Sequence, residues 1–377
     1  MVLANYLKEV KRMKAHKVPA TYLSGWEIPT LKDRIYVFDK TELSKSGITK
    51  RFRDVDKITT EHSYFMEEDF YYIDLRIEGI DYKLRKEITD FLSQNLYSIT
   101  CEDDLAEIAD GEPRPIVSIN TIDMFHTYKE NMHTWMITDS SGVTVHPDVF
   151  KAALNKYIFD RVGVIVEENY FANTLETKWN DVRDSIISDA EGHNSGDPIV
   201  LSRKKEFLEF YTIQYLRVNK RYNDIIPVLD MIKRIFSEMG LTSVEISNLE
   251  QDGLLSPRPY FYGILLDTAR GDKDKVNNTI DTLDKEFSID VLKASSGKSF
   301  LTSTSPCITT KTDISGKIEM IFPLTSQYCI RFQKSDSEPT GKYYELTDDE
   351  VKNINAAVIA DSTDIIFSEQ DNIAHLL

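Results

Sequence analysis

The stretch Ile318-Glu-Met-Ile-Phe-Pro-Leu-Thr-Ser-Gln-Tyr-Cys-Ile-Arg-Phe332 contains two short runs, 318–322 and 328–332, in which β-branched, aromatic and other apolar residues are concentrated. Runs of this length and composition favour β-strands. Another such run, Phe300-Leu-Thr302, precedes them. We therefore expect strands between 288 and 333.

The centre of the chain, from about 147 to 286, has a helical pattern instead. Its clearest apolar face recurs every three to four residues, at Phe171, Leu175, Trp179, Val182 and Ile186. This spacing places the five side chains on one side of a helix, where core packing is expected. Further helices are expected at about 202–219, 223–239, 259–269 and 272–286, the last with Phe287 at the end of its apolar face.

Both ends of the chain add to this centre. Arg34-Ile-Tyr-Val-Phe38 predicts a strand, and Thr347-Asp-Asp-Glu350 is a capping box that predicts the start of a last helix. We expect an α+β fold in which a mostly helical centre packs on a mixed or antiparallel sheet built from both chain ends. The N- and C-terminal strands must then meet in space.

Residues 61–146 differ from the rest and predict a small inserted α+β module. It holds a strand at Tyr71–Leu75, a helix at Tyr82–Leu92 and a hairpin around Asp139-Ser-Ser-Gly142. Its segment 102–115 is acidic and rich in Gly and Pro, which predicts a loop. The predicted organisation is therefore a main α+β domain at 1–60 and 147–377, with the module at 61–146.

The charge limits the class of partner. Lys plus Arg total 45 and Asp plus Glu total 62, which gives 45 − 62 = −17 over 377 residues. This argues against a protein that coats nucleic acid, because that affinity comes mostly from Lys and Arg. Two short basic runs, Lys50-Arg-Phe-Arg53 and Arg203-Lys-Lys205, could still form a local cleft, although charge runs are usually solvated surface.

The location is predicted from what the sequence lacks. Its apolar runs fall well short of the ~18 residues that a membrane span needs. The first residues, 1–12, have no secretory or other targeting pattern. The cysteines, Cys101, Cys307 and Cys329, are widely spaced and odd in number, as in a reducing compartment. We expect a soluble cytoplasmic protein that does not contact membranes.

Common catalytic and cofactor motifs fail on spacing. Gly297-Lys-Ser299 resembles the end of a P-loop, but Leu292 stands where that motif needs glycine. His126 and His133 have no Cys or Asp partner at metal-ligand spacing. No nucleophile elbow or dinucleotide fingerprint occurs. We therefore expect no metal and no cofactor.

Three segments, taken in order, carry a family resemblance: His16-Lys-Val-Pro-Ala-Thr-Tyr-Leu23, Phe210-Tyr-Thr-Ile-Gln-Tyr-Leu-Arg217 and Phe300-Leu-Thr-Ser-Thr-Ser-Pro306. They resemble a widespread bacterial domain-of-unknown-function family with an N-terminal His-x-Val-Pro-x-x-Tyr-Leu signature, a central Gln-x-x-Arg helix and a Thr-Ser-x-x-Pro strand end. The resemblance covers about 1–60 and 160–370. The resemblance implies no agreed activity. It implies defence or toxin-like roles only because such proteins are often found in variable bacterial gene neighbourhoods.

The chain departs from that family pattern at several positions. Ala15 stands in place of the first His of a common pair, Ala20 where Gln is usual, Val218 where Thr is usual and Thr304 where Asp is usual. If that Asp is catalytic in relatives, this chain lacks the chemistry.

A catalytic interpretation places seven residues in one pocket. Arg217 would bind a phosphate or carboxylate, His16 would act as general acid or base, and Glu176 would orient it. The substrate would be bound by the remaining four, Gln214, Ser303, Asn355 and Tyr22. Such a set is compatible with metal-independent phosphodiester cleavage or nucleotide modification.

A structural interpretation uses the same residues. Arg217 would pair with Glu176 between core helices, because a buried charge needs a partner. Gln214, Ser303 and Asn355 would bond backbone groups at strand and helix ends.

Two functions follow from these interpretations. The first is a bacterial effector or enzyme, a nuclease candidate in antiphage defence, that acts on nucleic acid or a nucleotide through a local cleft. The second is a non-catalytic interaction or sensor protein that binds a protein partner through the 61–146 module.

Overall fold

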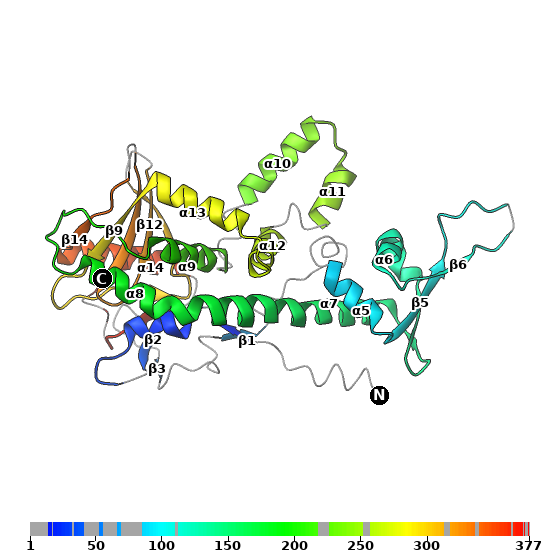
Figure 1. Cartoon of the computed structure of the whole chain (residues 1–377), viewed down its shortest axis with the longest axis horizontal. Helices are drawn as coiled ribbons and strands as arrows, with labels where there is room; N and C mark the ends of the chain where they lie inside the picture. Colours follow the sequence, from blue (N-terminus) through cyan, green and yellow to red (C-terminus); the bar gives the residue numbers. More distant parts are fainter. Residues whose placement is uncertain are drawn as a thin grey trace. The chain divides into compact units, whose positions relative to one another are not determined.

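The computed structural model (Figure 1) describes most of the chain, and helices and strands are labelled as in that figure. The described residues are 14–16, 18–31, 34–40, 53–55, 66–68, 85–109, 112–217, 226–251, 257–312, 317–335, 339–362, 365–371, 373 and 376. The strand predicted at Tyr71–Leu75 and the basic residues Lys50 and Arg51 lie outside these ranges.

The contacts within the chain define two compact units. Unit 1 comprises Met1–Met13, Tyr71–Val166 and Tyr222–Leu266, and unit 2 comprises Lys14–Phe70, Glu167–Arg221 and Asp267–Leu377. Each unit is described by itself below. The predicted inserted module, 61–146, shares most of its length with the second segment of unit 1, and its predicted boundaries stay a prediction.

A five-stranded sheet forms the centre of unit 2. Its strand order is β11-β12-β13-β9-β14, and all neighbours are antiparallel except β14, which runs parallel to β9. Its strands are β9 (Phe287–Lys293), β11 (Ile308–Thr312), β12 (Lys317–Pro323), β13 (Tyr328–Lys334) and β14 (Tyr343–Glu345). The two runs at 318–332 are thus adjacent strands, as their composition predicts.

Helices cover both faces of this sheet. On one face, α9 (Lys204–Arg217) packs Phe207 against Phe332, with ring centroids 5.9 Å apart. On the other face, α14 (Asp348–Asp361) places Val351 and Val358 in a core cluster with Ile321 of β12. Because alternate residues of a strand point to opposite faces, Ile321 and its neighbour Phe322 serve different helices. Unit 2 is therefore a layered α+β structure.

A second sheet of unit 2 joins segments from both chain ends. Its order is β10-β15-β2-β3, with all pairs antiparallel. Its strands are β2 (Ile35–Asp39), β3 (Arg53–Val55), β10 (Thr302–Ser303) and β15 (Ile365–Ser368). This arrangement confirms that N- and C-terminal strands meet. A further short pair joins β1 (Lys14–His16) to β4 (Met66–Glu68).

The remaining helices of unit 2 agree with the apolar spacing of the sequence. All five residues of the predicted face from Phe171 to Ile186 are buried. These helices are α2 (Ala20–Leu23), η1 (Ser24–Trp26), α8 (Thr177–Ala190), α13 (Asp274–Glu286) and η3 (Val164–Glu176), of which the first three residues belong to unit 1. The helix predicted at 272–286 ends one residue before Phe287, which begins β9 instead. Thr347 and Glu350 form both hydrogen bonds of the predicted capping box.

Unit 1 contains a four-stranded antiparallel sheet of order β6-β5-β7-β8 with helices on one face. The elements from 85 to 163 are α5 (Arg85–Ser93), β5 (Tyr97–Glu102), β6 (Ile116–Ser118), α6 (Ile122–Tyr128), η2 (Lys129–Thr134), β7 (Met136–Asp139), β8 (Thr144–Val145) and α7 (Pro147–Gly163). Ile99 and Ile137 are buried on the helix-covered face, whereas Met136 is exposed. The predicted hairpin is confirmed. In the predicted loop, residues 103–109 and 112–115 form neither helix nor strand, Glu102 ends β5, and residues 110 and 111 lie outside the described ranges.

Three more helices follow in sequence: α10 (Ile226–Glu238), α11 (Ser243–Gln251) and α12 (Pro257–Ala269). α10 and α11 are in contact with each other.

Candidate functional site

Two of the predicted substrate-binding residues hold the segment 299–303 in unit 2. The Tyr22 hydroxyl donates to Pro323 O at 2.6 Å and lies 2.9 Å from Thr302 Oγ1, from which it accepts because it has one proton. Burial raises the pKa of Tyr22. Asn355 Oδ1 accepts from Leu301 N at 2.8 Å. Both side chains are completely buried.

The amide group of Asn355 is fully used by this segment and its surroundings. Nδ2 donates to Ser299 O and to Leu376 O, each at 3.0 Å. Ser303, also buried, accepts a hydrogen bond from Ser305 N through its own Oγ at 3.1 Å. The structure therefore brings Tyr22, Ser303 and Asn355 to one segment. Asn355 fixes the backbone that enters β10, Tyr22 bonds Thr302 within it, and Ser303 fixes the backbone that leaves it.

Gln214 and Arg217 lie on one face of α9, as their spacing predicts. Arg217 Nη1 donates to Gln214 Oε1 at 3.4 Å, and its guanidinium carbon lies 3.4 Å from the centroid of the Phe171 ring. Arg217 is 1% exposed and Gln214 is 0% exposed. A cation on an aromatic face is stabilised most when both are removed from water. Arg217 is thus packed inside unit 2.

The last two predicted catalytic residues are also placed in unit 2. His16 ends β1, where it is opposite Met66 of β4, and its side chain lies outside what the structure describes. Glu176 ends η3 and is half-buried. Convergence of the seven residues in one pocket stays a prediction.

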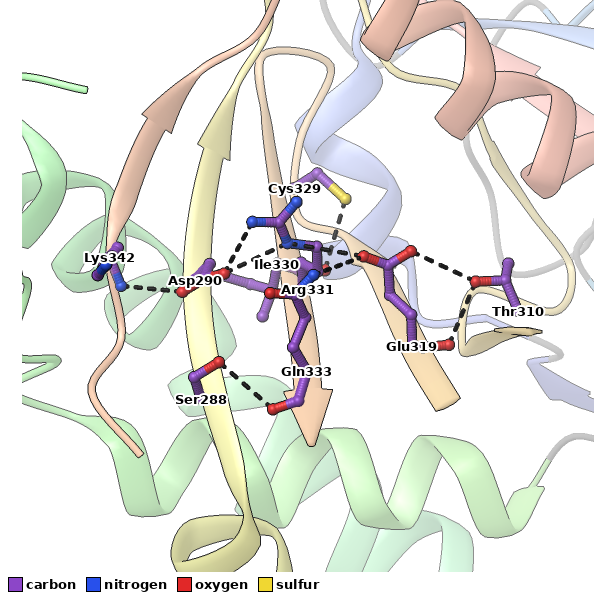
Figure 2. Close-up of polar contacts among 9 residues, drawn as sticks. All are labelled: Ser288, Asp290, Thr310, Glu319, Cys329, Ile330, Arg331, Gln333 and Lys342. Atoms are coloured by element: carbon purple, nitrogen blue, oxygen red, sulfur yellow. Dashed lines mark hydrogen bonds and ion pairs between the residues drawn. The ribbon is translucent and has the colours of Figure 1, made fainter. Parts of the chain in front are cut away.

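A charged network that sequence reasoning missed crosses the five-stranded sheet (Figure 2). Arg331 lies between Asp290 of β9 and Glu319 of β12, with Nε 3.7 Å from Glu319 Oε1. Gln333 Nε2 donates to the same Glu319 oxygen at 3.2 Å, and Thr310 Oγ1 donates to Oε2 at 3.5 Å. Alternating polar positions in β12 and β13 could have indicated it. Since its members bond one another, the network favours a structural role.

The basic run at 203–205 is also engaged in pairs. Arg203 Nε lies 3.4 Å from Glu206 Oε1, and Lys204 Nζ lies 2.5 Å from Asp284 Oδ1. This pairing agrees with a solvated face and lowers the positive charge that a phosphate would meet.

The acidic loop, residues 102–115, is the most distinctive surface of unit 1. Its base is closed by a hydrogen bond from Asp103 N to Pro115 O at 2.7 Å. Asp103 Oδ1 accepts from the Tyr128 hydroxyl at 2.7 Å, and Asp104 accepts from the side chain of Asn131. The hydrogen bond to Asp103, aided by burial, raises the pKa of Tyr128 to about 12.

Large apolar side chains of this region are exposed among the acidic residues. Leu105 is 66% exposed and Ile108 is 39% exposed, and Ile116 on β6 is 56% exposed beside Glu102. Sequence reasoning treated the segment only as a loop, although two apolar residues three apart in an acidic run were a signal for a surface contact. Neighbouring acidic groups, Glu102, Glu107 and Glu112, form no ion pair with the described residues. The loop's single basic residue is Arg114.

The described residues contain no group of three or more His, Cys, Asp or Glu side chains that could hold a metal ion. Within the same part of the chain, none of the helices has the length and apolar character required to cross a bilayer.

These observations define the class of protein by its structure alone: a layered α+β fold organised in two units. The family model described as "Protein of unknown function (DUF4238)" matches residues 14–372, and the chain belongs to this family. The expected membership in a domain-of-unknown-function family is thereby confirmed. No curated protein and no solved structure matches the chain.

Proposed function

We propose that the protein is a non-catalytic interaction or sensor protein that binds a protein partner through unit 1. The observation that carries this proposal is where exposed apolar side chains gather. Thirteen large apolar residues of the described chain are exposed, and two of them, Leu31 and Val200, belong to unit 2, which leaves eleven in unit 1. An exposed apolar patch is a common feature of protein-binding sites.

The acidic loop is the part of unit 1 with the most specific chemistry for a partner. It combines Leu105, Ile108 and the adjacent Ile116 with carboxylates that the described residues do not neutralise. A partner segment that carries Lys or Arg beside aliphatic or aromatic side chains would bury the apolar groups and neutralise the acidic ones. The proposed occupant is therefore a basic, partly apolar protein segment.

Three of the predicted site residues support this class by their surroundings: Arg217, predicted as catalytic, and Gln214 and Asn355, predicted to bind substrate. Arg217 is packed on Phe171 and bonded to Gln214, and the Asn355 amide bonds three backbone groups. A side chain used in this way is poorly placed to bind a substrate. The hypothesis of a metal-independent nuclease or nucleotide-modifying enzyme stays a prediction.

The proposed setting follows the family resemblance. We place the protein in the bacterial cytoplasm, with a role in antiphage defence. Three buried free thiols, Cys101, Cys307 and Cys329, support a reducing compartment.

Selection of random 16-residue peptides displayed on phage tests the proposal with the full chain as bait. We expect the selected peptides to combine basic with apolar residues, and their affinity to fall steeply as NaCl rises. The double variants Leu105→Ser/Ile108→Ser and Glu102→Gln/Glu107→Gln should each weaken binding at least fivefold. Val200→Ser, an exposed valine of unit 2, is the control and should bind as the wild type does.

Two outcomes would contradict the proposal. The first is a set of peptides without basic residues, or binding that survives both double variants. The second comes from incubating the same preparations with single-stranded RNA, single-stranded DNA and nucleotides. Turnover that Arg217→Met abolishes in a folded protein, and that Leu105→Ser/Ile108→Ser leaves unchanged, would assign the enzyme class instead.

A further inference from the structure

A pocket of about 310 Å³ lies in unit 1, at the end of the sheet where β5 begins, opposite the end from which the acidic loop leaves. β5 begins there, while β6 and β7 end there, so the turns beyond three strands contribute to its wall. This volume is at the lower end of the range for small-molecule sites, which is roughly 300–1,000 Å³. The pocket is therefore sized for one small molecule.

The polar part of the wall consists of hydroxyl, amide and carboxylate groups: Asn95, Ser98, Ser118, Asn120, Asp139 and Ser140. The two amides and three hydroxyls make no side-chain hydrogen bond to the described residues. They remain available as donors and acceptors for a ligand, in competition with water.

Asp139 is the one member whose position is fixed by its own hydrogen bonds. Its Oδ1 accepts from Ser141 N at 2.9 Å and from Val143 N at 3.0 Å. These bonds set the turn between β7 and β8, in which Gly142 has a φ of 77°. Oδ2 has no partner among the described residues, so a preorganised carboxylate oxygen is offered at the pocket wall.

Asn95 is positioned by the backbone in a different way. It has a φ of 55°, the one non-glycine residue of the described chain with positive φ. Asn adopts this left-handed conformation more readily than most residues, which explains its presence between α5 and β5. The turn directs the chain from the helix into the sheet at the pocket.

The apolar part of the wall includes three aromatic residues that pack on one another. Tyr97 lies edge-on to Phe150 at 5.2 Å between ring centroids, and Phe91 lies 5.8 Å from Tyr97. Aromatic and aliphatic groups of this kind contact the C–H groups of a ligand, while the polar wall contacts its oxygens. The mixture favours a ligand with both.

The charge of the wall selects among such ligands. It contains one carboxylate and no Lys, Arg or His. A phosphate or carboxylate ligand would find no cationic side chain here and would be repelled by the carboxylate of Asp139. A neutral molecule with several adjacent hydroxyls fits, because carboxylate and amide oxygens each accept from more than one hydroxyl.

We infer that this pocket binds a neutral polyhydroxylated small molecule of about monosaccharide size. The inference goes beyond the proposed function, since it concerns a different surface of unit 1 and a different kind of ligand. Unit 1 would then have two binding sites. The acidic loop, at one end of β5, would bind the protein partner, and the pocket at the other end of β5 would bind a small uncharged molecule.

Saturation-transfer-difference NMR with the full chain tests the inference. The probes are D-glucose, D-galactose, D-mannose, N-acetyl-D-glucosamine, D-ribose and myo-inositol, each tested alone, and glucose 6-phosphate as the anionic counterpart. We expect at least one neutral probe to bind with a dissociation constant of about 1 mM or lower, a level typical of weak specific ligands. Glucose 6-phosphate should bind at least tenfold more weakly than that probe.

Variants locate the binding site. Ser98→Val and Asn120→Ala should each reduce the affinity at least fivefold, because each removes a polar group from the wall. Thr144→Val, on the neighbouring strand β8 and outside the wall, is the matched control and should leave the affinity unchanged. Val suits a strand, so Ser98→Val and Thr144→Val should both fold.

Three results would overturn the inference: no transfer to any neutral probe, tighter binding of the phosphate ester, or full affinity in Ser98→Val and Asn120→Ala. Peptide binding at the acidic loop is measured in a separate experiment. If no small molecule binds the pocket, the proposed function is unaffected, and if no peptide binds the loop, the inference about the pocket is unaffected.

Discussion

Arg331 and Asp290 are directly opposite each other on β13 and β9, and the arginine donates two hydrogen bonds to one carboxylate oxygen. Nε and Nη2 lie 3.3 Å and 2.9 Å from Asp290 Oδ2 (Figure 2). Asp290 Oδ1 accepts from Lys342 N at 3.0 Å. One buried carboxylate therefore ties β9 to β13 and to the residue that precedes β14.

Replacing this carboxylate should destabilise unit 2. Asp290→Ala is expected to lower the free energy of unfolding by about 1–3 kcal/mol, because it leaves Lys342 N without its acceptor and removes one partner of Arg331. The loss stays below that of a fully buried pair, since the Arg331 side chain is 22% exposed and keeps Glu319. Urea denaturation measures it. The double variant Asp290→Leu/Arg331→Met should recover part of the free energy of unfolding. A loss of less than about 0.5 kcal/mol in Asp290→Ala would contradict this account.

Gly341 is required by a close approach of two backbones. A β-carbon at this position would overlap the carbonyl oxygen of Ile289 on β9. Gly341→Ala should therefore force β14 away from β9 and lower the free energy of unfolding by about 1–3 kcal/mol, as overpacking does elsewhere. Thr340→Ala, the exposed neighbour, is the control for thermal denaturation. Equal melting temperatures of the two variants would show that the backbone relaxes at this point without penalty.

Asn355 should behave as a structural residue. Asn355→Ala removes three hydrogen bonds and leaves buried backbone groups of Leu301, Ser299 and Leu376 without partners. We expect a loss of about 2–4 kcal/mol in the free energy of unfolding. Asn353→Ala, on the exposed side of the same helix, should change it by less than about 0.5 kcal/mol. A stable Asn355→Ala variant that loses a biochemical activity would instead assign this side chain to a substrate.

The acidic loop should be detectable through a tyrosine titration. The pKa of Tyr128 is raised to about 12, first by its hydrogen bond to Asp103 and then by burial. NMR of ¹³C-labelled tyrosine measures this value, with Tyr128→Phe to assign the signal. Asp103→Asn should lower the pKa toward the reference value near 10. Because the folded pKa is the higher one, the contribution to stability is complete below pH 10 and is lost as the pH rises toward 12.

An unchanged Tyr128 titration in Asp103→Asn would mean that the loop is not held by this bond in solution. The loop would then present its apolar residues in another arrangement, and the choice of Leu105 and Ile108 as contact residues would need revision.

Helices and strands with a strong period could be predicted from the sequence, because their patterns arise from one-sided burial. The face from Phe171 to Ile186 and the capping box at Thr347 are examples, and both are confirmed. β9 was harder, since Phe287 continues the apolar spacing of α13 directly into the strand. β14 and β15 were missed because they have three and four residues, too few for a strand pattern to show in the sequence.

The candidate site was less predictable, because a polar residue in a sequence does not show which groups it will contact. Gln214 and Arg217 share a helix face, as spacing predicts, yet the contact of Arg217 with Phe171 depends on how two helices pack. The polar wall of the unit 1 pocket comes from three strands, β5, β6 and β7, and from the turns beside them. No single segment of sequence carries that pattern.

The sheet β10-β15-β2-β3 has a consequence for biosynthesis. Phe38 of β2 is opposite Ile366 of β15, a separation of 366 − 38 = 328 residues. At the general translation rate of about 5–20 residues per second, the partner of β2 emerges from the ribosome about 16–66 s after β2 itself. β2 can pair with β3 soon after both are made, but its other edge stays without β15 until these 328 residues have been added.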